Sequence, residues 1–214
     1  LHYPLRRQRQ MCIRDRSPLI KVDTDKPVSA YIALLPQIPA PAILHWVSFW
    51  QYGFDENYPD LLPPKPEFGT TAEMATLFGI ANAAGFFNMP YTNPTWWDDE
   101  APTFQGLSPA EVAVLDRNGN PLYECYTGSA DAPPCTPENA ARDSTFNASR
   151  QAYEWLHGGY VVSPRVDAVQ QRLAQLMQQM TVDLPSDLIF EDQVGARAMD
   201  FDYNPAALHP AMYH

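Results

Sequence analysis

Short apolar runs that alternate with helical patterns constrain the fold of this chain more than any other feature. Four of the runs are rich in aromatic or β-branched side chains, as β-strands are. They are residues 43–50, 86–91, 160–163 and 188–195. Residues 70–84 and 164–180 instead place apolar side chains at helical spacing. Strands that alternate with helices predict a parallel sheet built from βαβ units.

The number of these units indicates which parallel fold to expect. No G-x-G-x-x-G or P-loop motif follows any predicted strand, which argues against a dinucleotide or nucleoside triphosphate site. A (β/α)8 barrel has eight strand–helix units over about 250 residues. The sequence predicts about four parallel strands, so we expect an α/β fold that is the N-terminal half of a (β/α)8 (TIM) barrel, a fragment of a longer chain. Asn118 and Gly119 lie between apolar segments and predict an inserted β-hairpin within an insertion at about residues 98–137.

The N-terminal segment differs in character from the rest. Residues 1–16 are arginine-rich and resemble a translated adapter peptide that recurs at the ends of metagenomic assemblies, so we treat them as an artefact or a disordered segment. A basic N-terminal arm is the alternative. We expect residues 17–39 to be an extended lead-in and residues 40–214 to be a partial (β/α)8 catalytic domain.

Composition excludes several classes of protein. The net charge is −11 and 45% of the residues are hydrophobic, so neither a disordered tail nor a nucleic-acid-binding protein is expected. No apolar run is long enough to span a membrane. Cys125 and Cys135 flank a proline-rich loop and could form a disulfide, and no C-x-x-C pair predicts a zinc site. The oligomeric state stays open, and an extracellular or periplasmic location is slightly favoured for the full-length protein.

The carboxyl ends of the predicted strands hold the candidate binding residues, because reactive groups of α/β barrels gather at that end. Aromatic rings, amides and carboxylates occur there together, and this combination favours a carbohydrate ligand. The candidates are Trp46, Trp50, Tyr91, Asn93, Trp96, Trp97, Asp98, Glu191, Gln193 and Arg197. Each has a structural alternative: the tryptophans can be core residues, and Asp98 can belong to a solvated loop or cap a helix.

Two adjacent acids close the last predicted strand. Side chains alternate along a strand, so Leu188, Phe190 and Asp192 are expected on one face and Glu191 on the other. An ionised carboxylate at a strand end is costly unless it is paired or has a chemical role. Pairing with an arginine, Arg197 or Arg165, is the structural alternative to a catalytic role for Asp192.

Two segments carry a resemblance to a known family. Residues 187–196 (DLIFEDQVGA) resemble the fourth-strand region of retaining (β/α)8 glycoside hydrolases, and residues 87–97 (FNMPYTNPTWW) resemble a second-strand motif. The resemblance is to DUF6259, an uncharacterised family similar to α-galactosidase and endo-α-N-acetylgalactosaminidase barrels. It implies that Asp192 is the catalytic nucleophile and that the acid/base lies on a later strand. It further implies a glycan substrate with an α-linked hexose and no metal or organic cofactor.

The same resemblance suggests roles for the binding residues. Tyr91, Trp96 and Trp97 would shape the sugar subsite. Asn93 would bind hydroxyl groups, and Arg197 would either bind hydroxyl groups or keep the carboxylate of Asp192 ionised. A non-catalytic carbohydrate-binding barrel protein is one alternative. The other is a metal-dependent hydrolase that uses His45, although the strand at 43–50 lacks an H-x-H pair.

Overall fold

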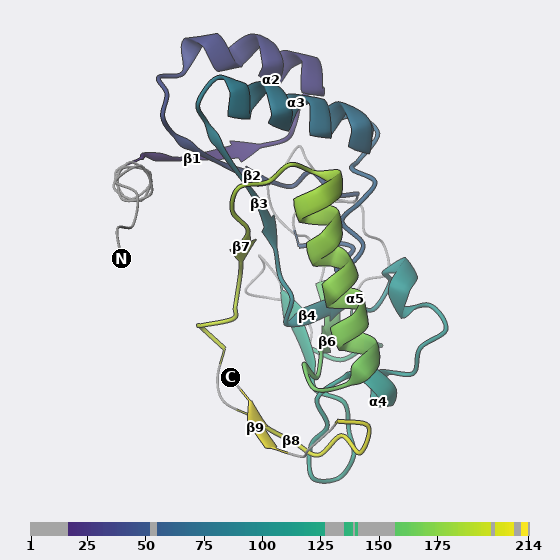
Figure 1. The fold of residues 1–214 in the computed structure, drawn as a ribbon. Helices are drawn as coiled ribbons and strands as arrows, with labels where there is room; N and C mark the ends of the chain where they lie inside the picture. The colour runs from purple at the N-terminus through teal and green to yellow at the C-terminus, as the bar shows by residue number, and fades with distance from the viewer. Residues whose placement is uncertain are drawn as a thin grey trace, which may run out of the picture.

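The computed structural model describes residues 17–51, 55–126, 135–138, 140, 157–197, 200–207 and 211–213. Its centre is a four-stranded sheet in the order β1-β2-β3-β7, in which every neighbouring pair is parallel (Figure 1). The strands are β1 (Leu19–Asp23), β2 (Ile43–Val47), β3 (Phe87–Thr92) and β7 (Phe190–Glu191). The strands follow one another across the sheet in chain order, which is the arrangement found in a barrel.

Helices connect the strands and cover one face of the sheet. They are α2 (Val28–Leu34) with the 3-10 turn η1 (Leu35–Gln37), α3 (Thr71–Ala83), and α5 (Asp167–Gln178) with the π-helical turn η3 (Gln179–Asp183). In Figure 1, α2 and α3 run side by side along β1 and β2, and α5 leads toward β7. A reciprocal capping box between Thr70 and Glu73 starts α3, within the segment predicted to be helical. None of the described helices is long and apolar enough to span a bilayer.

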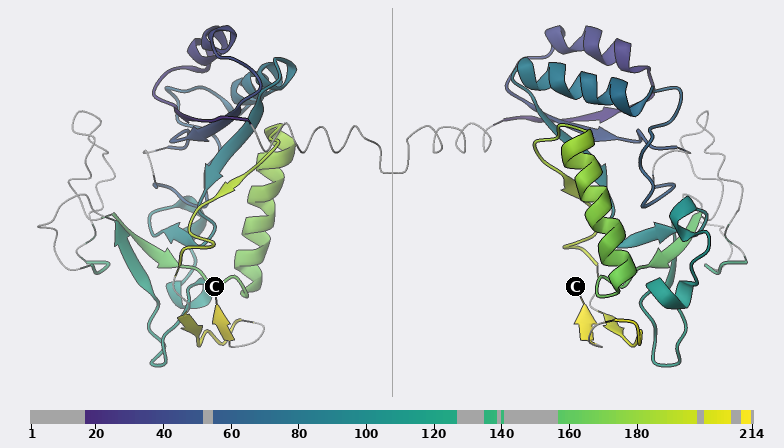
Figure 2. Two further views of the ribbon diagram at one scale, coloured as in Figure 1. Left: turned by 90° about the vertical axis from the view of Figure 1, so that its left-hand side faces the viewer. Right: turned by 45° about the vertical axis from the view of Figure 1, so that its right-hand side comes forward.

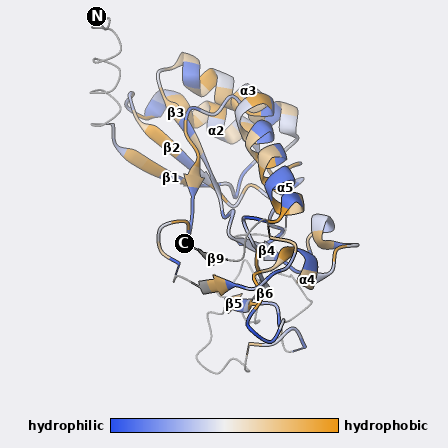
Figure 3. Cartoon of the chain, turned by 60° about the horizontal axis from the view of Figure 1, so that its bottom comes forward, coloured by the Kyte–Doolittle hydropathy of each residue, from blue (hydrophilic) through white to orange (hydrophobic). Residues whose placement is uncertain are grey.

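The core between the sheet and the helices centres on Trp46. Its ring is 1% exposed and packs against Tyr31 of α2 and Phe78 of α3 at centroid distances of 5.8 and 5.5 Å. Its indole N–H donates to Asn88 Oδ1 at 2.9 Å, and the Asn88 amide donates to the carbonyl of Phe78 at 3.0 Å. Figure 3 shows β1 and β2 mainly in the hydrophobic colour, as expected for strands that pack against helices.

A second sheet is inserted between β3 and α5. It is antiparallel, in the order β4-β6-β5, and Figure 2 shows it at the end of the molecule away from α2 and α3. Its strands are β4 (Trp96–Asp98), β5 (Tyr123–Tyr126) and β6 (His157–Val161), accompanied by the 3-10 turn η2 (Pro102–Phe104) and the short helix α4 (Pro109–Val112). A disulfide joins Cys125 on β5 to Cys135, and the short ribbon of β8 (Asp200–Asp202) and β9 (Ala211–Tyr213) follows β7.

The parallel sheet has four strands, as predicted, but one of the predicted segments is not part of it and another segment takes its place. Residues 17–39 are not an extended lead-in, because they form β1, α2 and η1, the first strand–helix unit. Residues 160–163 do not form a parallel strand, because β6 pairs antiparallel with β4 and β5. The segment 87–97 therefore begins on the third parallel strand rather than the second. The strand before Asp192 is still the fourth, because the two errors cancel. Residues 1–16 lie outside the described residues.

Candidate functional site

Asp192 lies at the carboxyl end of β7, where its carboxylate meets the hydroxyl of Tyr91. The Tyr91 O–H donates to Asp192 Oδ2 at 2.8 Å. The ring of Phe190 stacks on Tyr91 at 5.4 Å and lies 4.6 Å from the imidazole of His45. Phe190 and Asp192 thus contact the same side chain on the face of the sheet opposite the helices. Glu191, which alternates with them, is exposed.

A loop after β2 brings a second carboxylate to the same tyrosine. Asp55 Oδ1 accepts a hydrogen bond from the Tyr58 hydroxyl at 2.9 Å and lies 3.4 Å from the Tyr91 hydroxyl oxygen. The Tyr91 hydroxyl has one proton, and the shorter distance directs it to Asp192. Burial, the charge of Asp55 and the hydrogen bond to Asp192 raise the pKa of Tyr91 well above its ordinary value. The tyrosine therefore stays protonated and acts as a donor.

Backbone strain gathers at this edge of the sheet. Four non-glycine residues in the described part of the chain have a positive φ: Ser48 (59°), Asp55 (63°), Asn57 (64°) and Gln193 (66°). Ser48 directly follows β2, the next two lie in the loop after β2, and Gln193 follows Asp192. Left-handed backbone at such residues is uncommon and occurs often at functional sites. This distribution marks the carboxyl ends of β2 and β7 as the candidate site.

The same loop carries a buried acid beside the site. Glu56 is 4% exposed, and burial raises the pKa of its carboxyl to about 9, with a further contribution from the charges of Asp98 and Glu100. Asp98 accepts hydrogen bonds from the backbone N–H groups of Asn57 at 2.6 Å and Glu100 at 2.8 Å, so it orders the two loops. Among the described residues, no group of three or more histidine, cysteine or acidic side chains is placed to hold a metal ion.

The four predicted tryptophans are buried and have no exposed face. Trp46 packs toward the helices, on the side of the sheet away from Tyr91. Trp50 lies under the site, with its ring stacked on Tyr91 at 5.7 Å. Trp96 packs edge-on against Tyr58 at 6.1 Å, and Trp97 belongs to a separate core of the insertion. The exposed fractions of all four are at most 1%, so they pack as core residues in this structure and do not present an open face on which a sugar ring could stack.

The remaining predicted residues serve local structure or lie beside Asp192. The side chain of Asn93 accepts hydrogen bonds from the backbone N–H and the hydroxyl of Thr95. Arg197 pairs with Glu124 on β5 at 2.5 Å and donates to Thr95 at 3.0 Å. The insertion sheet thus supplies the ionic partner of Arg197, and Tyr91 and Gln193 supply the contacts described for the carboxylate of Asp192. The amide nitrogen of Gln193 lies 3.5 Å from Asp192 Oδ2.

Sequence reasoning missed Asp55 and Tyr58. Both lie in the proline-rich loop after β2, which carries no recognisable motif. The available signal was positional: the loop follows the carboxyl end of a parallel strand, where barrel sites form. Applying that rule to every acid between residues 48 and 69 would have included Asp55.

Comparison with solved structures finds proteins of similar fold. An α-N-acetylgalactosaminidase from Bifidobacterium bifidum, NagBb, in complex with Gal-NHAc-DNJ, aligns with a TM-score of 0.63 at 12% identity, over 94% of this chain and 31% of the other. An α-galactosidase from Thermus thermophilus, TtGalA, aligns at 0.51 and 15% identity, over 81% and 30%. A maltogenic α-amylase from Thermotoga neapolitana, AmyB, aligns at 0.52 and 8% identity, over 81% and 38%.

These neighbours are glycoside hydrolases with TIM-barrel-type folds, and the chain spans about a third of their length. At such identities the likeness concerns the fold alone. No curated protein sequence matches the chain. A family model described as "Domain of unknown function (DUF6259)" matches residues 9–213. The chain therefore belongs to the DUF6259 family.

Proposed function

We propose that this chain is the N-terminal half of a (β/α)8 glycoside hydrolase and that Asp192 is the nucleophile of a retaining reaction. The observation that carries the proposal is the placement of Asp192 after the fourth parallel strand, with its carboxylate bound by Tyr91 at 2.8 Å. The parallel sheet accounts for four of the eight strands of a barrel. The much longer glycosidase neighbours support the same interpretation.

The chemistry follows from the position of the carboxylate. An Asp192 oxygen would attack the anomeric carbon while the glycosidic C–O bond breaks and an acid protonates the departing oxygen. Water would then hydrolyse the glycosyl ester and restore the original anomeric configuration. Retaining glycosidases need two carboxyl groups about 5–5.5 Å apart. The acid/base in this proposal is on a later strand, so residues 1–214 alone are expected to be inactive.

Tyr91 has a defined part in this reaction. Its hydroxyl holds Oδ2 of Asp192, so the other oxygen, Oδ1, would be the one that attacks. Because burial and neighbouring carboxylates keep the pKa of Tyr91 high, the hydroxyl donates a proton but does not release it at neutral pH. The sugar would lie over the Tyr91–Asp192 pair, next to Phe190 and Asp55. We propose an α-linked hexose as the substrate class, in line with the names of two of the structural neighbours.

The test uses the intact gene, recovered from its source DNA and expressed in full. The product is assayed with aryl α-glycosides of galactose, N-acetylgalactosamine and glucose. Asp192→Ala should abolish hydrolysis, and added azide should restore cleavage and yield a glycosyl azide of inverted configuration, because azide replaces the missing nucleophile. Glu191→Gln is the matched control, because it removes an adjacent acid that is exposed on the other face of the sheet.

The other outcomes identify the alternatives. Hydrolysis that survives Asp192→Ala would refute the proposed role of this residue. Binding of sugars without turnover, unchanged in Asp192→Asn, would identify a non-catalytic carbohydrate-binding protein. Loss of activity with a chelator, restored by a divalent metal, would identify a metal-dependent hydrolase instead.

A further inference from the structure

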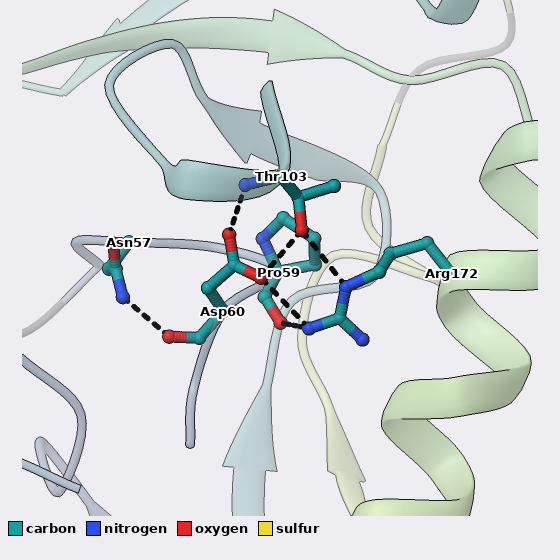
Figure 4. A network of polar contacts seen from close by, with 5 residues as sticks. All are labelled: Asn57, Pro59, Asp60, Thr103 and Arg172. Carbon is teal, nitrogen blue, oxygen red and sulfur yellow. Dashed lines mark hydrogen bonds and ion pairs between the residues drawn. The ribbon is translucent and has the colours of Figure 1, made fainter. Parts of the chain in front are cut away.

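A partly buried ion pair links the loop after β2 to helix α5. Arg172 on α5 donates to Asp60 Oδ1 at 3.0 Å and to the carbonyl oxygen of Pro59 at 2.8 Å (Figure 4). Its Nε donates to the hydroxyl of Thr103 at 3.1 Å. The guanidinium thus joins three segments: the loop after β2, the turn η2 of the insertion, and the helix that leads to β7.

The carboxylate of Asp60 also accepts two hydrogen bonds from Thr103. The backbone N–H of Thr103 donates to Oδ2 and its hydroxyl donates to Oδ1, both at 2.6 Å. The side chains of Arg172 and Asp60 are only 13% and 17% exposed. At such burial the pair has few competing water contacts, and removing one partner leaves the other desolvated and unpaired. The fork geometry of arginine fixes orientation as well as distance.

We call the Arg172–Asp60 pair and its hydrogen bonds the clamp. The loop segment that the clamp holds also carries Asp55 and Tyr58. The backbone N–H of Asp60 donates to the carbonyl of Asn57 at 2.6 Å, and the Asn57 amide donates back to the carbonyl of Asp60 at 2.5 Å. Tyr58 lies inside this turn and is completely buried. Its ring lies 5.5 Å from Trp50 and 6.5 Å from Tyr91, and its hydroxyl donates to Asp55.

The two ends of the clamp therefore meet the candidate site from both sides. The loop after β2 places Tyr58 and Asp55 against Tyr91. Helix α5 precedes β7 and so sets the approach of the strand that ends at Asp192. Tyr91 contacts both groups, with Asp55 at 3.4 Å and Asp192 at 2.8 Å. A shift of α5 relative to the loop would change the position of Asp192 relative to Asp55, and with it the contacts of the Tyr91 hydroxyl.

We propose that Arg172 and Asp60 are positioning residues, which hold the loop after β2 and helix α5 in the register that places Asp55 and Asp192 on either side of the Tyr91 hydroxyl. The catalytic part of this inference rests on the proposed function, whereas its geometric part does not. The pair touches none of the reacting atoms and acts through Tyr58 and the loop backbone.

The test compares variants of the intact gene product well below its unfolding temperature. Arg172→Met keeps the length of the side chain and removes the charge, and Arg172→Lys keeps the charge but loses the fork. Asp60→Asn is the isosteric change on the other side of the pair, in case Arg172→Met fails to fold. Arg117→Met, in the exposed turn between Asp116 and Asn120, is the matched control.

The first readout is independent of activity: the 13Cζ resonance of Tyr91 in tyrosine-labelled protein, assigned by its loss in Tyr91→Phe. We expect this resonance to move in Arg172→Met and Asp60→Asn, to move less in Arg172→Lys, and to stay in place in Arg117→Met. The resonance of Tyr123, whose hydroxyl donates to Asp99 at 2.9 Å in the insertion, is the internal reference and should not change. A Tyr91 resonance that stays in place in folded Arg172→Met and Asp60→Asn overturns the inference.

The second readout is hydrolysis. We expect kcat/KM to fall on the order of 10²-fold in Arg172→Met, because displacements near 1 Å can cost that much, and to recover in part in Arg172→Lys. The double variant Arg172→Met/Asp60→Asn should be no worse than the more impaired single variant, because both changes break one interaction. Full activity despite a shifted Tyr91 resonance would refute a role in catalysis. A wild-type protein without hydrolase activity whose Tyr91 resonance still responds would refute the proposed function and leave the geometric inference intact.

Discussion

Replacing Glu56 by glutamine should stabilise the protein, and by more as the pH rises. Glu56 is 4% exposed and lies among other acids, so burial raises the pKa of its carboxyl from 4.5 to about 9. The unfolded chain releases this proton above about pH 4.5, whereas the folded protein keeps it until about pH 9. Folding therefore takes up a proton over this range, and the free energy of unfolding falls as the pH rises.

The size of the effect follows from the shift. Each pH unit between the two values lowers the free energy of unfolding by about 1.4 kcal/mol. At pH 7 the accumulated loss is about 3 kcal/mol, and at pH 5 it is less than about 1 kcal/mol. Glutamine has the shape and charge of the protonated acid, so the neighbouring carboxyls titrate alike in both proteins. The Glu56→Gln variant therefore differs from the wild type only in that its folding does not take up a proton at position 56.

Urea unfolding, followed by tryptophan fluorescence at pH 5, 6, 7 and 8, measures the difference between variant and wild type. We expect the difference to grow with pH at about 1.4 kcal/mol per unit. Glu67→Gln changes an exposed glutamate and is the matched control, for which we expect a much smaller difference than for Glu56→Gln. A constant difference for Glu56→Gln from pH 5 to 8 would mean that Glu56 ionises in the folded protein as it does in the unfolded chain, and would refute the reasoning.

Three further stability predictions concern two glycines and the disulfide. Gly159→Ala should cost about 1–3 kcal/mol in urea unfolding, because a Cβ there would lie 2.3 Å from the carbonyl oxygen of Trp97. Gly79→Ala, in α3 with open space around it, should instead stabilise by about 0.5–1 kcal/mol, and an equal effect at both glycines would contradict the packing argument. Reducing the disulfide between Cys125 and Cys135 should lower the free energy of unfolding by about 2–4 kcal/mol. Cys125→Ser should have the free energy of unfolding of the reduced protein, and added reductant should not change it.

Local signals in the sequence located several elements correctly. The Thr70–Glu73 capping box starts α3, and the Asn118–Gly119 turn is closed by hydrogen bonds to the Asp116 carboxylate. These motifs can be recognised in the sequence because their hydrogen bonds join residues only two to four positions apart. The alternation of Phe190, Glu191 and Asp192 was predictable for the same reason.

The partner of each strand, in contrast, depends on segments that are distant in the sequence. The segment at 160–163 has the apolar character of a buried parallel strand, but β6 gains its partners from β4 and β5 and so runs antiparallel. The reverse holds for β1, whose mixed side chains look like a linker and whose place in the sheet comes from its register with β2. A short strand has few side chains to specify a partner, and the choice depends on which edges the rest of the chain leaves open.

The sequence by itself determined that the chain contains a parallel α/β sheet and that Asp192 closes one of its strands. It did so because hydrophobic periodicity and strand-end chemistry are local properties. Only the tertiary structure decided that the tryptophans are buried, that Arg197 pairs with Glu124, and that Asp55 meets Asp192 at Tyr91. Burial and pairing depend on contacts between residues far apart in the chain, and residue type alone does not specify those contacts.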